Sequence, residues 1–241
     1  MRIRSRQELA GVSDPAWPHI QQLVAEAAVP VRVMPTRDPH EATTALFRLQ
    51  VTTHSTLGAL AANCGAVLVD GGWLRLLGSG VEGLPSLPEA NGLGEPGETR
   101  GPLGHLVVGY DVLGGTFAVN GRGLPSEPGE VCYFGPDTLS WTPLGVPGHS
   151  ALLRWAIAGG LAEAFADLRW PGWERDVAAL TPGEGITYYP PLWSAEAHNG
   201  TVAVRRSPAS LTELVSSHQE SARQLADLPN DSQVMIRIKN D

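Results

Sequence analysis

The sequence of 241 residues contains only two cysteines, Cys64 and Cys132, and their separation matches no spacing typical of metal or redox sites. A framework of several disulfide bonds is therefore excluded. The core must be held together by apolar packing, which a chain of this length with 42% hydrophobic residues can supply. We expect two reduced, buried thiols, as in a cytoplasmic protein, although a single disulfide between them stays open.

Long apolar runs are also missing. Nowhere do 18 apolar residues follow one another, and the N-terminal stretch MRIRSRQELAG has basic residues but no apolar segment of signal-peptide length. The sequence therefore predicts neither a membrane span nor export, and the expected location is the cytoplasm.

Positive charge is scarce as well, because 17 basic residues stand against 25 acidic ones and give a formal net charge of −8. Binding to nucleic acid or to anionic lipid depends on a basic surface, so neither partner is expected. An acidic surface suits a basic partner.

Patterns typical of catalytic and metal sites are absent. The seven histidines are scattered, with no pair at helical spacing. Ser150 in GHSAL lacks the second glycine of a nucleophile elbow and is better explained as the start of a helix. No local signature supports a catalytic dyad of Cys64 with a histidine. Asp111 and Asp137 lie in expected turns, where aspartate mostly bonds to the local backbone. We expect no metal, no cofactor and no catalytic residue.

One motif imitates a nucleotide site. Gly78, Gly80 and Gly83 follow an apolar run in the order GxGxxG, which in dinucleotide-binding proteins leads into a helix. Here Pro85 and Pro88 follow, and proline removes amide donors and disfavours helical backbone before it. The motif therefore predicts a strand that ends in a glycine-rich loop.

Periodicity organises the rest of the chain. Capping residues and apolar spacing predict helices over 14–29 and 38–49, and a short strand lies between them. From residue 50 the pattern changes to short strands with tight turns at 70–72, 114–115 and 135–137, interrupted by a surface loop over 85–102. Helices follow at 149–168, with a break at Gly159, and at 172–180. A last helix is expected from Ser207 with Pro208 at its start, and a further strand within 230–241.

The order of these elements predicts the fold class. Connections between neighbouring strands are too short for helical crossovers, so the strands should pair antiparallel. Helices, then strands, then helices are typical of an α+β fold, with helices covering one face of a mainly antiparallel sheet of about six strands. We expect an α+β core domain over residues 1–180 and a C-terminal extension over 181–241 packed on that core.

Aromatic residues gather in the second half of the chain. Segments such as RWPGW and YYPPLW are turn-like, so some of their rings should reach the surface, where tryptophan and tyrosine often carry binding energy. The alternative role of these aromatic residues is packing in the core. The candidate binding residues are Asp111, Asp137, Trp141, Trp170, Trp173, Tyr188, Tyr189 and Trp193.

Two resemblances bear on function. The stretches GWLRLLGSG, LVVGYDVLGGTFAVN, GEVCYFGPDTLSWTPLG and SALLRWAI, within about residues 60–160, resemble the core of the SUKH superfamily of bacterial immunity-type, Smi/Knr-like domains. The phrases DPAWP, QVTT, CYFGPDTLSW and RWPGWE, within about residues 5–215, look like an uncharacterised bacterial domain-of-unknown-function family. The first resemblance implies an α+β fold that binds proteins, often toxins, and has no catalytic residues to carry over.

These observations give one expectation and one alternative. The expectation is a non-enzymatic module that binds another protein, in its concrete form a basic toxin, while association with a second copy stays open. The alternative is an enzyme or small-ligand binder with a pocket between the sheet and the aromatic-rich second half.

Overall fold

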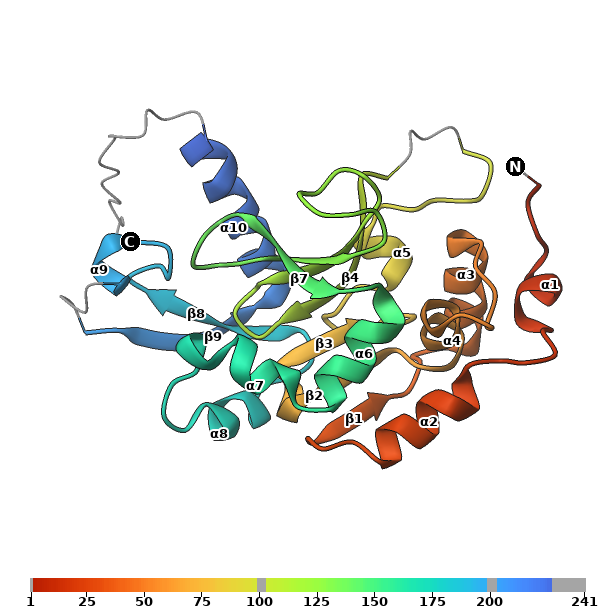
Figure 1. The fold of residues 1–241 in the computed structure, drawn as a ribbon, viewed down its shortest axis with the longest axis horizontal. Coiled ribbons are helices and arrows are strands. Elements are labelled where there is room, and N and C mark those ends of the chain that lie inside the picture. Colours follow the sequence, from red (N-terminus) through yellow and green to blue (C-terminus); the bar gives the residue numbers. More distant parts are fainter. Residues whose placement is uncertain (1, 99–102, 199–202, 227–241) are drawn as a thin grey trace.

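The computed structural model describes residues 2–98, 103–198 and 203–226. The strand expected within 230–241 lies outside these residues. The chain has an α+β fold built on one antiparallel sheet of seven strands that follow one another in chain order (Figure 1). The strands are β1 (Val31–Met34), β2 (Ala66–Val69), β3 (Leu74–Leu77), β4 (His105–Asp111), β5 (Thr116–Asn120), β6 (Val131–Phe134) and β7 (Trp141–Val146).

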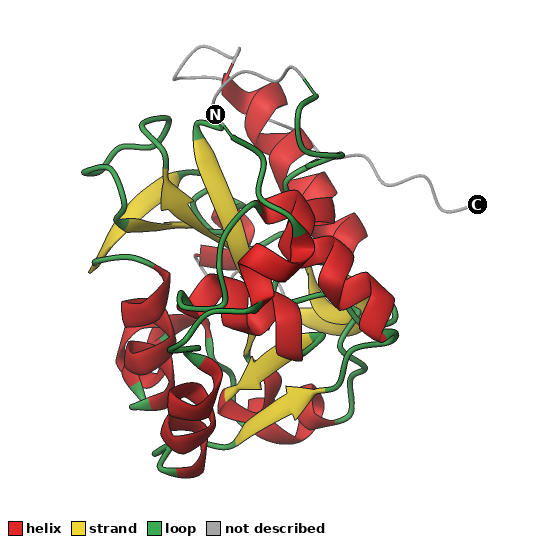
Figure 2. Ribbon diagram, turned by 90° about the vertical axis from the view of Figure 1, so that its right-hand side faces the viewer, coloured by secondary structure: helices red, strands yellow, loops and turns green. Residues whose placement is uncertain are grey.

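Helices of the N-terminal part form a layer beside the sheet. Figure 2, which faces this end of the molecule, shows helices in front of the strands, and α3 contacts both α1 and α4. This layer comprises α1 (Arg6–Ala10), α2 (Trp17–Ala25), α3 (Pro39–Leu49) and α4 (Thr56–Asn63). The start of α3 follows the expected pattern, because the Asp38 side chain accepts a hydrogen bond from the His40 amide and Pro39 takes the first helical position.

Helices of the second half cover the sheet. Figure 1 shows α6 (His149–Ile157) and α7 (Gly160–Ala164) in front of the strands, with η2 (Ala166–Leu168) and α8 (Trp173–Ala178) after them. The expected break is confirmed, since Gly159 adopts a left-handed conformation with φ of 93° between α6 and α7. At the end of α7, the Phe165 ring packs on Phe117 of β5 and Tyr133 of β6, at centroid distances of 5.9 and 4.9 Å.

One expected strand is a helix. The sequence pattern places residues 57–65 in the sheet, but α4 occupies 56–63. The Ser55 side chain accepts from the Gly58 amide and so caps this helix. A Cβ atom on Gly58 would lie 2.2 Å from the carbonyl oxygen of Thr52. The run of small residues therefore serves close helix packing, which short apolar runs do not distinguish from a buried strand.

The segment over 85–98 is more ordered than the surface loop expected there. It contains the short helix α5 (Leu87–Ala90), in which Leu87 is fully buried. Just beyond, the Asn91 side chain accepts from the Val107 amide and donates to the Val107 carbonyl oxygen. This segment is thereby fastened to β4.

The C-terminal part forms a second, two-stranded sheet. It consists of β8 (Glu184–Tyr189) and β9 (Arg205–Ser210), with α9 (Ala195–His198) between them and α10 (Leu211–Ala226) after them. The expectation that the last helix begins near Ser207 is wrong, because Ser207 and Pro208 pair with Thr187 and Ile186 of β8 and hold extended backbone. Among the described residues, no helix is both long and apolar enough to span a membrane.

Candidate functional site

Asp111 belongs to the interior of the turn between β4 and β5. Its side chain is fully buried and accepts hydrogen bonds from the amides of Leu113 and Gly115, both at 2.8 Å, and from the Tyr133 hydroxyl. Burial raises the pKa of this carboxyl group, and the three hydrogen bonds oppose that shift. The carboxylate is therefore committed to holding the turn.

A buried arginine lies near this turn. The Arg75 side chain of β3 is 2% exposed and donates from Nη2 to the carbonyl oxygen of Glu184, at 2.7 Å, while Nε and Nη1 have no partner among the described residues. Burial lowers the pKa of Arg75 to about 10, and the charges of Asp111 and Glu184 oppose that shift. Arg75 thus joins the main sheet to β8.

Three of the candidate aromatic residues pack into one cluster. Trp170 is buried and lies 6.1 Å from Trp73 and 5.9 Å from Tyr188 between ring centroids, and its Nε1 donates to Asp176. Trp173 meets the edge of Trp73 at 5.2 Å. The rings therefore pack on one another in the region where the sequence suggested a pocket, between the sheet and the second half.

Two arginines complete this cluster. Arg169 places its guanidinium 4.2 Å from the ring centroid of Trp173 and 4.9 Å from that of Trp73, and it also pairs with Asp70. Arg206 approaches Trp170 and Tyr188 at 5.2 and 5.5 Å. Cation–π contacts of this kind stabilise packed rings, so the cluster has a structural role that needs no ligand.

The other candidate residues lie apart from this cluster. Asp137 is half-buried in the turn between β6 and β7, and Trp141 of β7 packs on His105 and Phe134 at 5.1 and 5.5 Å. Tyr189 is 49% exposed, and Trp193 is half-buried in the segment after β8. The eight residues do not converge on one cavity, and their role in binding stays a prediction.

The residues weighed as nucleophiles have structural surroundings. Both cysteines are free and buried, and burial raises the pKa of the Cys64 thiol to about 12, which keeps it protonated and unreactive. The Ser150 hydroxyl lies 2.7 Å from that of Thr56. In the described part of the chain, no three histidine, cysteine or acidic side chains are grouped as metal ligands.

The glycine motif forms a loop that packs against its neighbours. A Cβ atom on Gly78 would lie 2.2 Å from the Cys64 carbonyl oxygen, so only glycine fits at this approach. Gly80 has a φ of 94°, and a Cβ there would lie 3.3 Å from Nη2 of Arg37. The helix that follows, α5, has four residues and begins at Leu87.

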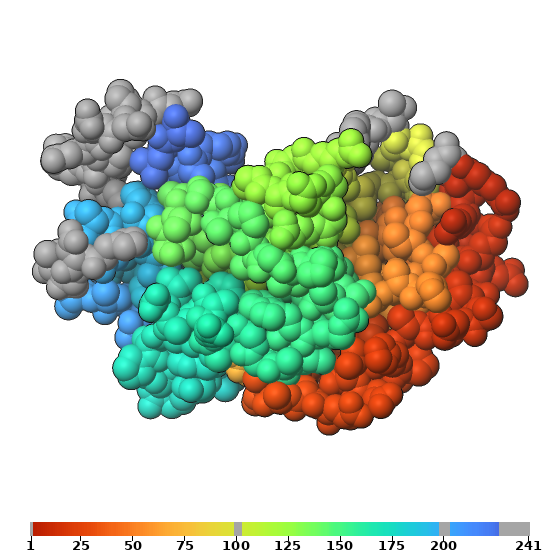
Figure 3. Space-filling model, in the orientation of Figure 1, coloured from red at the N-terminus to blue at the C-terminus, as the bar shows by residue number. Residues whose placement is uncertain are grey.

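A hollow of about 700 Å³ lies between the N-terminal segment, the end of α3, α4 and the stretches 93–98 and 103–106. We call it the apolar hollow, because nine of its twelve lining residues are apolar or glycine and the others are Arg48, Gln50 and Glu98. Figure 3 shows the segments that frame it meeting at the upper right, the N-terminal segment red, α3 and α4 orange, and the 93–98 stretch yellow. Pockets of 300–1,000 Å³ are typical of ligand sites.

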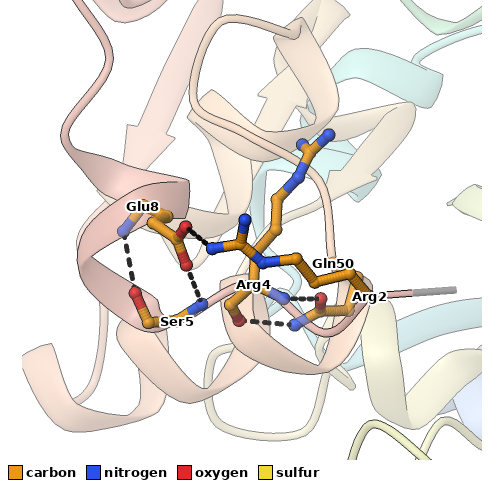
Figure 4. A network of polar contacts seen from close by, with 5 residues as sticks. All are labelled: Arg2, Arg4, Ser5, Glu8 and Gln50. Atoms are coloured by element: carbon orange, nitrogen blue, oxygen red, sulfur yellow. Dashed lines mark hydrogen bonds and ion pairs between the residues drawn. The ribbon is translucent and has the colours of Figure 1, made fainter.

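Exposed apolar side chains line this hollow. Ile3 is 46% exposed and Leu103 is 39% exposed, and both belong to its lining. Ile3 is held in place by its neighbour, because the Gln50 side chain accepts from the Arg4 amide at 2.8 Å and donates to the Arg4 carbonyl oxygen at 3.2 Å (Figure 4). Glu8 and Ser5 cap the following helix α1 and also appear in Figure 4. Hydrogen bonds therefore fix the N-terminal wall of the apolar hollow.

A second hollow, of about 250 Å³, lies between α3 and the stretch 79–89. We call it the polar hollow, since its lining includes two arginines, two glutamates, one histidine and three hydroxyl side chains. The arginines are Arg37 and Arg48, the glutamates Glu41 and Glu89, and the others His40, Thr44, Ser79 and Ser86. Arg48 lines both hollows, which follow one another along α3.

Sequence reasoning missed every residue of the two hollows. The walls of the apolar hollow come from five stretches that are distant in the chain, and those of the polar hollow from two, 37–48 and 79–89. The second of these includes part of the glycine motif, which indicates a turn and not a binding site. One local signal is the set Glu41, Thr44 and Arg48, whose spacing of three and four places it on one face of α3, with Arg37 just before that helix. On its own, this pattern describes an ordinary solvated helix face.

Comparison with known proteins identifies relatives but no activity. The family described as "Protein of unknown function DUF2625" matches residues 6–214. The uncharacterized protein YbfG of Escherichia coli (strain K12) is 39% identical over 212 residues, which cover 88% of this chain and 94% of that protein. An uncharacterized protein of Haemophilus influenzae (strain KW20 / Rd) is 30% identical over 191 residues, covering 79% and 83%. No solved structure matches the chain.

Proposed function

The chain belongs to the DUF2625 family of proteins of unknown function, and from this premise we propose that it is a non-enzymatic module whose apolar hollow receives apolar side chains of a partner protein. The observation that carries the proposal is the joint presence of Ile3 and Leu103 in the lining of one hollow. Large apolar side chains that are exposed singly need no explanation, but exposed apolar surface gathered around a concavity is typical of binding sites.

The net charge indicates the kind of partner. At −8, the chain attracts a basic protein over a distance, which speeds encounter and makes the association rate fall as salt is added. The concrete form of the proposal is a basic toxin that the chain neutralises. The resemblance of residues 60–160 to immunity-type SUKH domains supports this form. The neutralisation of a toxin stays a prediction.

The proposal is tested with a hollow-filling variant. Leu57 is half-buried in α4 and lines the hollow, so Leu57→Trp should fill part of it. The matched control is Val204→Trp, because Val204 is 37% exposed and does not line either hollow. Tagged wild-type and variant chains are used to capture partners from the native cell, and the captured protein is purified and tested for binding.

We expect a basic protein that binds the wild type and the Val204→Trp control and binds Leu57→Trp at least tenfold more weakly. Its association rate with the wild type should fall several-fold between low and high salt. Arrest of growth by that protein expressed alone, and relief by this chain, would support the toxin form. An acidic partner, or equal binding by Leu57→Trp, would contradict the proposal.

Two further outcomes would replace the proposed partner by another occupant. The dye 1-anilinonaphthalene-8-sulfonate binds exposed apolar surface. If Leu57→Trp abolishes dye binding while no protein depends on the hollow, the occupant is a small apolar molecule. If the wild type forms dimers in light scattering and Leu57→Trp does not, the occupant is a second copy.

A further inference from the structure

We infer that the polar hollow is a separate binding site for a small zwitterion that carries a carboxylate and an ammonium group, of the size of a free α-amino acid. This inference goes beyond the binding of a partner protein. It depends on the charges that line the hollow, on one buried hydroxyl group and on the volume.

Two guanidinium groups provide the positive charge. Arg37 pairs through Nε with Glu41 at 3.0 Å, and Arg48 pairs through Nε with Glu95 at 3.2 Å. Both arginines line the hollow together with Glu89. The hydrogen bond from the Ser86 amide lowers the pKa of Glu89, and the charges of Arg37 and Arg48 add to that shift. Among the described residues, the hydrogen bonds of Arg37 and Arg48 engage Nε alone, which leaves the terminal nitrogens of each guanidinium group for a ligand. A guanidinium group binds a carboxylate with good geometry.

Two carboxylates provide the negative charge. Glu89 accepts the Ser86 amide through Oε2, and Glu41 binds Arg37 through Oε2. In the described part of the chain, neither glutamate has a hydrogen bond at its second oxygen. The lining holds two positive and two negative side chains, and Glu95 outside the lining also pairs with Arg48, so the hollow presents both signs of charge to a ligand. A zwitterion satisfies both signs at once.

Thr44 gives an observation independent of charge. Thr44 belongs to the lining of the polar hollow, and its hydroxyl oxygen is buried with no hydrogen-bond partner among the described residues. The neighbouring Thr43 hydroxyl donates to the His40 carbonyl oxygen at 2.9 Å. Buried polar groups in proteins are nearly always hydrogen-bonded. The carboxylate of a bound zwitterion would supply the missing acceptor.

The volume limits the size of the ligand. A hollow of about 250 Å³ lies below the roughly 300–1,000 Å³ typical of drug-sized ligands and far above the roughly 10–15 Å³ that one water molecule needs. A molecule with a short side chain fits this range, whereas a nucleotide does not.

Calorimetric titration of the purified full chain tests the inference. The probes are glycine, L-alanine, L-serine and L-leucine, together with propionate and ethylamine, which are alanine without its ammonium and without its carboxylate. We expect one-to-one binding of at least one amino acid. If that ligand is alanine, propionate and ethylamine should each bind at least tenfold more weakly. For another amino acid, the comparison uses its half-molecules, which are the same molecule without its ammonium group and without its carboxylate.

Matched variants connect binding to the hollow. Thr44→Val keeps the shape of the side chain and removes the hydroxyl group, and Arg48→Gln removes one positive charge. Each should weaken amino-acid binding at least tenfold. The controls are Thr43→Val on the same helix and Arg223→Gln, which breaks an exposed pair with Glu220 in α10. Both controls should bind like the wild type, and thermal melting verifies that every variant is folded.

Three results would overturn the inference: no binding by any of the four amino acids, equal binding by the half-molecules, or unchanged binding by folded Thr44→Val. These results leave the proposed protein binding unaffected, because that test uses Leu57 of the apolar hollow. Conversely, normal amino-acid binding by Leu57→Trp would show that the two sites are separate.

Discussion

At the scale of single residues, burial shifts the pKa values of two enclosed groups, Asp111 and His149, in directions that can be measured. Asp111 is surrounded by donors, so its charged form is partly compensated, whereas His149 at the start of α6 is buried with no hydrogen-bond partner for either ring nitrogen among the described residues. Asp111 therefore acts as a structural acceptor, and His149 acts as an apolar residue that must stay neutral.

Removing the Asp111 acceptor should destabilise the fold. Asp111→Ala leaves the Leu113 and Gly115 amides and the Tyr133 hydroxyl without their acceptor, and we expect a loss of about 3–5 kcal/mol in the free energy of unfolding at pH 7. Asp111→Asn can keep both amide bonds through Oδ1 and should lose less than half of that. Urea unfolding measures both variants, and equal losses would contradict the assigned role.

The pH dependence of the Asp111 contribution follows from its pKa. Because burial raises the pKa of the folded carboxyl above its ordinary value of 3.8, the folded state holds this proton more tightly than the unfolded state. The stability of the wild type relative to Asp111→Asn should therefore be greatest below pH 3.8 and should decrease as the pH rises through the folded pKa. A stability difference between the wild type and Asp111→Asn that grows with pH would contradict the raised pKa.

His149 should produce a loss of stability in acid. Burial lowers its pKa from 6.5 to about 4, so the folded state resists protonation. Its contribution is fully present above pH 6.5 and is lost as the pH falls to about 4, by about 3 kcal/mol at 1.36 kcal/mol per pKa unit. His149→Leu removes this dependence, so the stability of the wild type relative to His149→Leu should fall over that range. Urea unfolding at pH 7 and pH 4 measures it.

At the scale of elements, the glycines after β3 act through close packing, and a matched pair of variants tests this. A Cβ on Gly78 would lie 2.2 Å from the Cys64 carbonyl oxygen, which is backbone and cannot easily move. We expect Gly78→Ala to lower the free energy of unfolding by about 3 kcal/mol or more. Gly71 also needs glycine, with a φ of 68°, but a Cβ added there would meet no atom within 4 Å.

The control Gly71→Ala should therefore cost only the left-handed backbone conformation, about 1–2 kcal/mol. Thermal melting compares the two variants, and failure of Gly78→Ala alone to fold is the extreme form of the expected result. Equal melting temperatures would show that Gly78 is required for its backbone freedom and not for close approach.

Local signals predict the elements that they control. Asp38 with Pro39 begins a helix, Gly159 breaks one, and short turns at 70–72 and 114–115 join antiparallel strands, because each depends on residues next to one another. The prediction is wrong at 56–63 because small apolar residues suit both a buried strand and a packed helix. It is wrong at the start of the last helix because pairing with β8 overrides the capping signal of Ser207.

The hollows could not be predicted for a related reason. Ile3, Leu57 and Leu103 are separated by more than 40 residues and meet only after α3, α4 and β4 have packed. Nothing in the local sequence marks Ile3 as exposed or the Thr44 hydroxyl as buried. The aromatic residues of the second half were visible in the sequence, but their mutual packing, with Arg169 and Arg206 between the rings, depends on tertiary structure.

At the scale of the whole molecule, the two-stranded sheet and α10 are joined to the main sheet at a few defined points. The Ile186 amide donates to the Val112 carbonyl oxygen at 2.7 Å. Within the C-terminal part, the Leu211 amide donates to the Gly183 carbonyl oxygen at 2.8 Å. Gly83 and Gly183 also pack backbone against backbone. Arg75 adds the bond to Glu184, and Ile186, Leu211 and Val215 of the C-terminal part belong to the same apolar core as the main sheet.

Replacing Arg75 should therefore loosen the C-terminal part without unfolding the main sheet. Arg75→Met removes the bond to the Glu184 carbonyl oxygen. It also removes a buried charge, two of whose nitrogens have no partner in the described part of the chain, and exchange of a buried charge for an apolar side chain often costs little overall. We expect amide hydrogen exchange at Ile186 to accelerate at least tenfold while the amides of β2 and β3 exchange at the wild-type rate, because opening of β8 is local. Acceleration of all these amides together would show instead that Arg75 stabilises the molecule as one cooperative unit, and unchanged exchange at Ile186 would show that the backbone bond to Val112 suffices to hold β8.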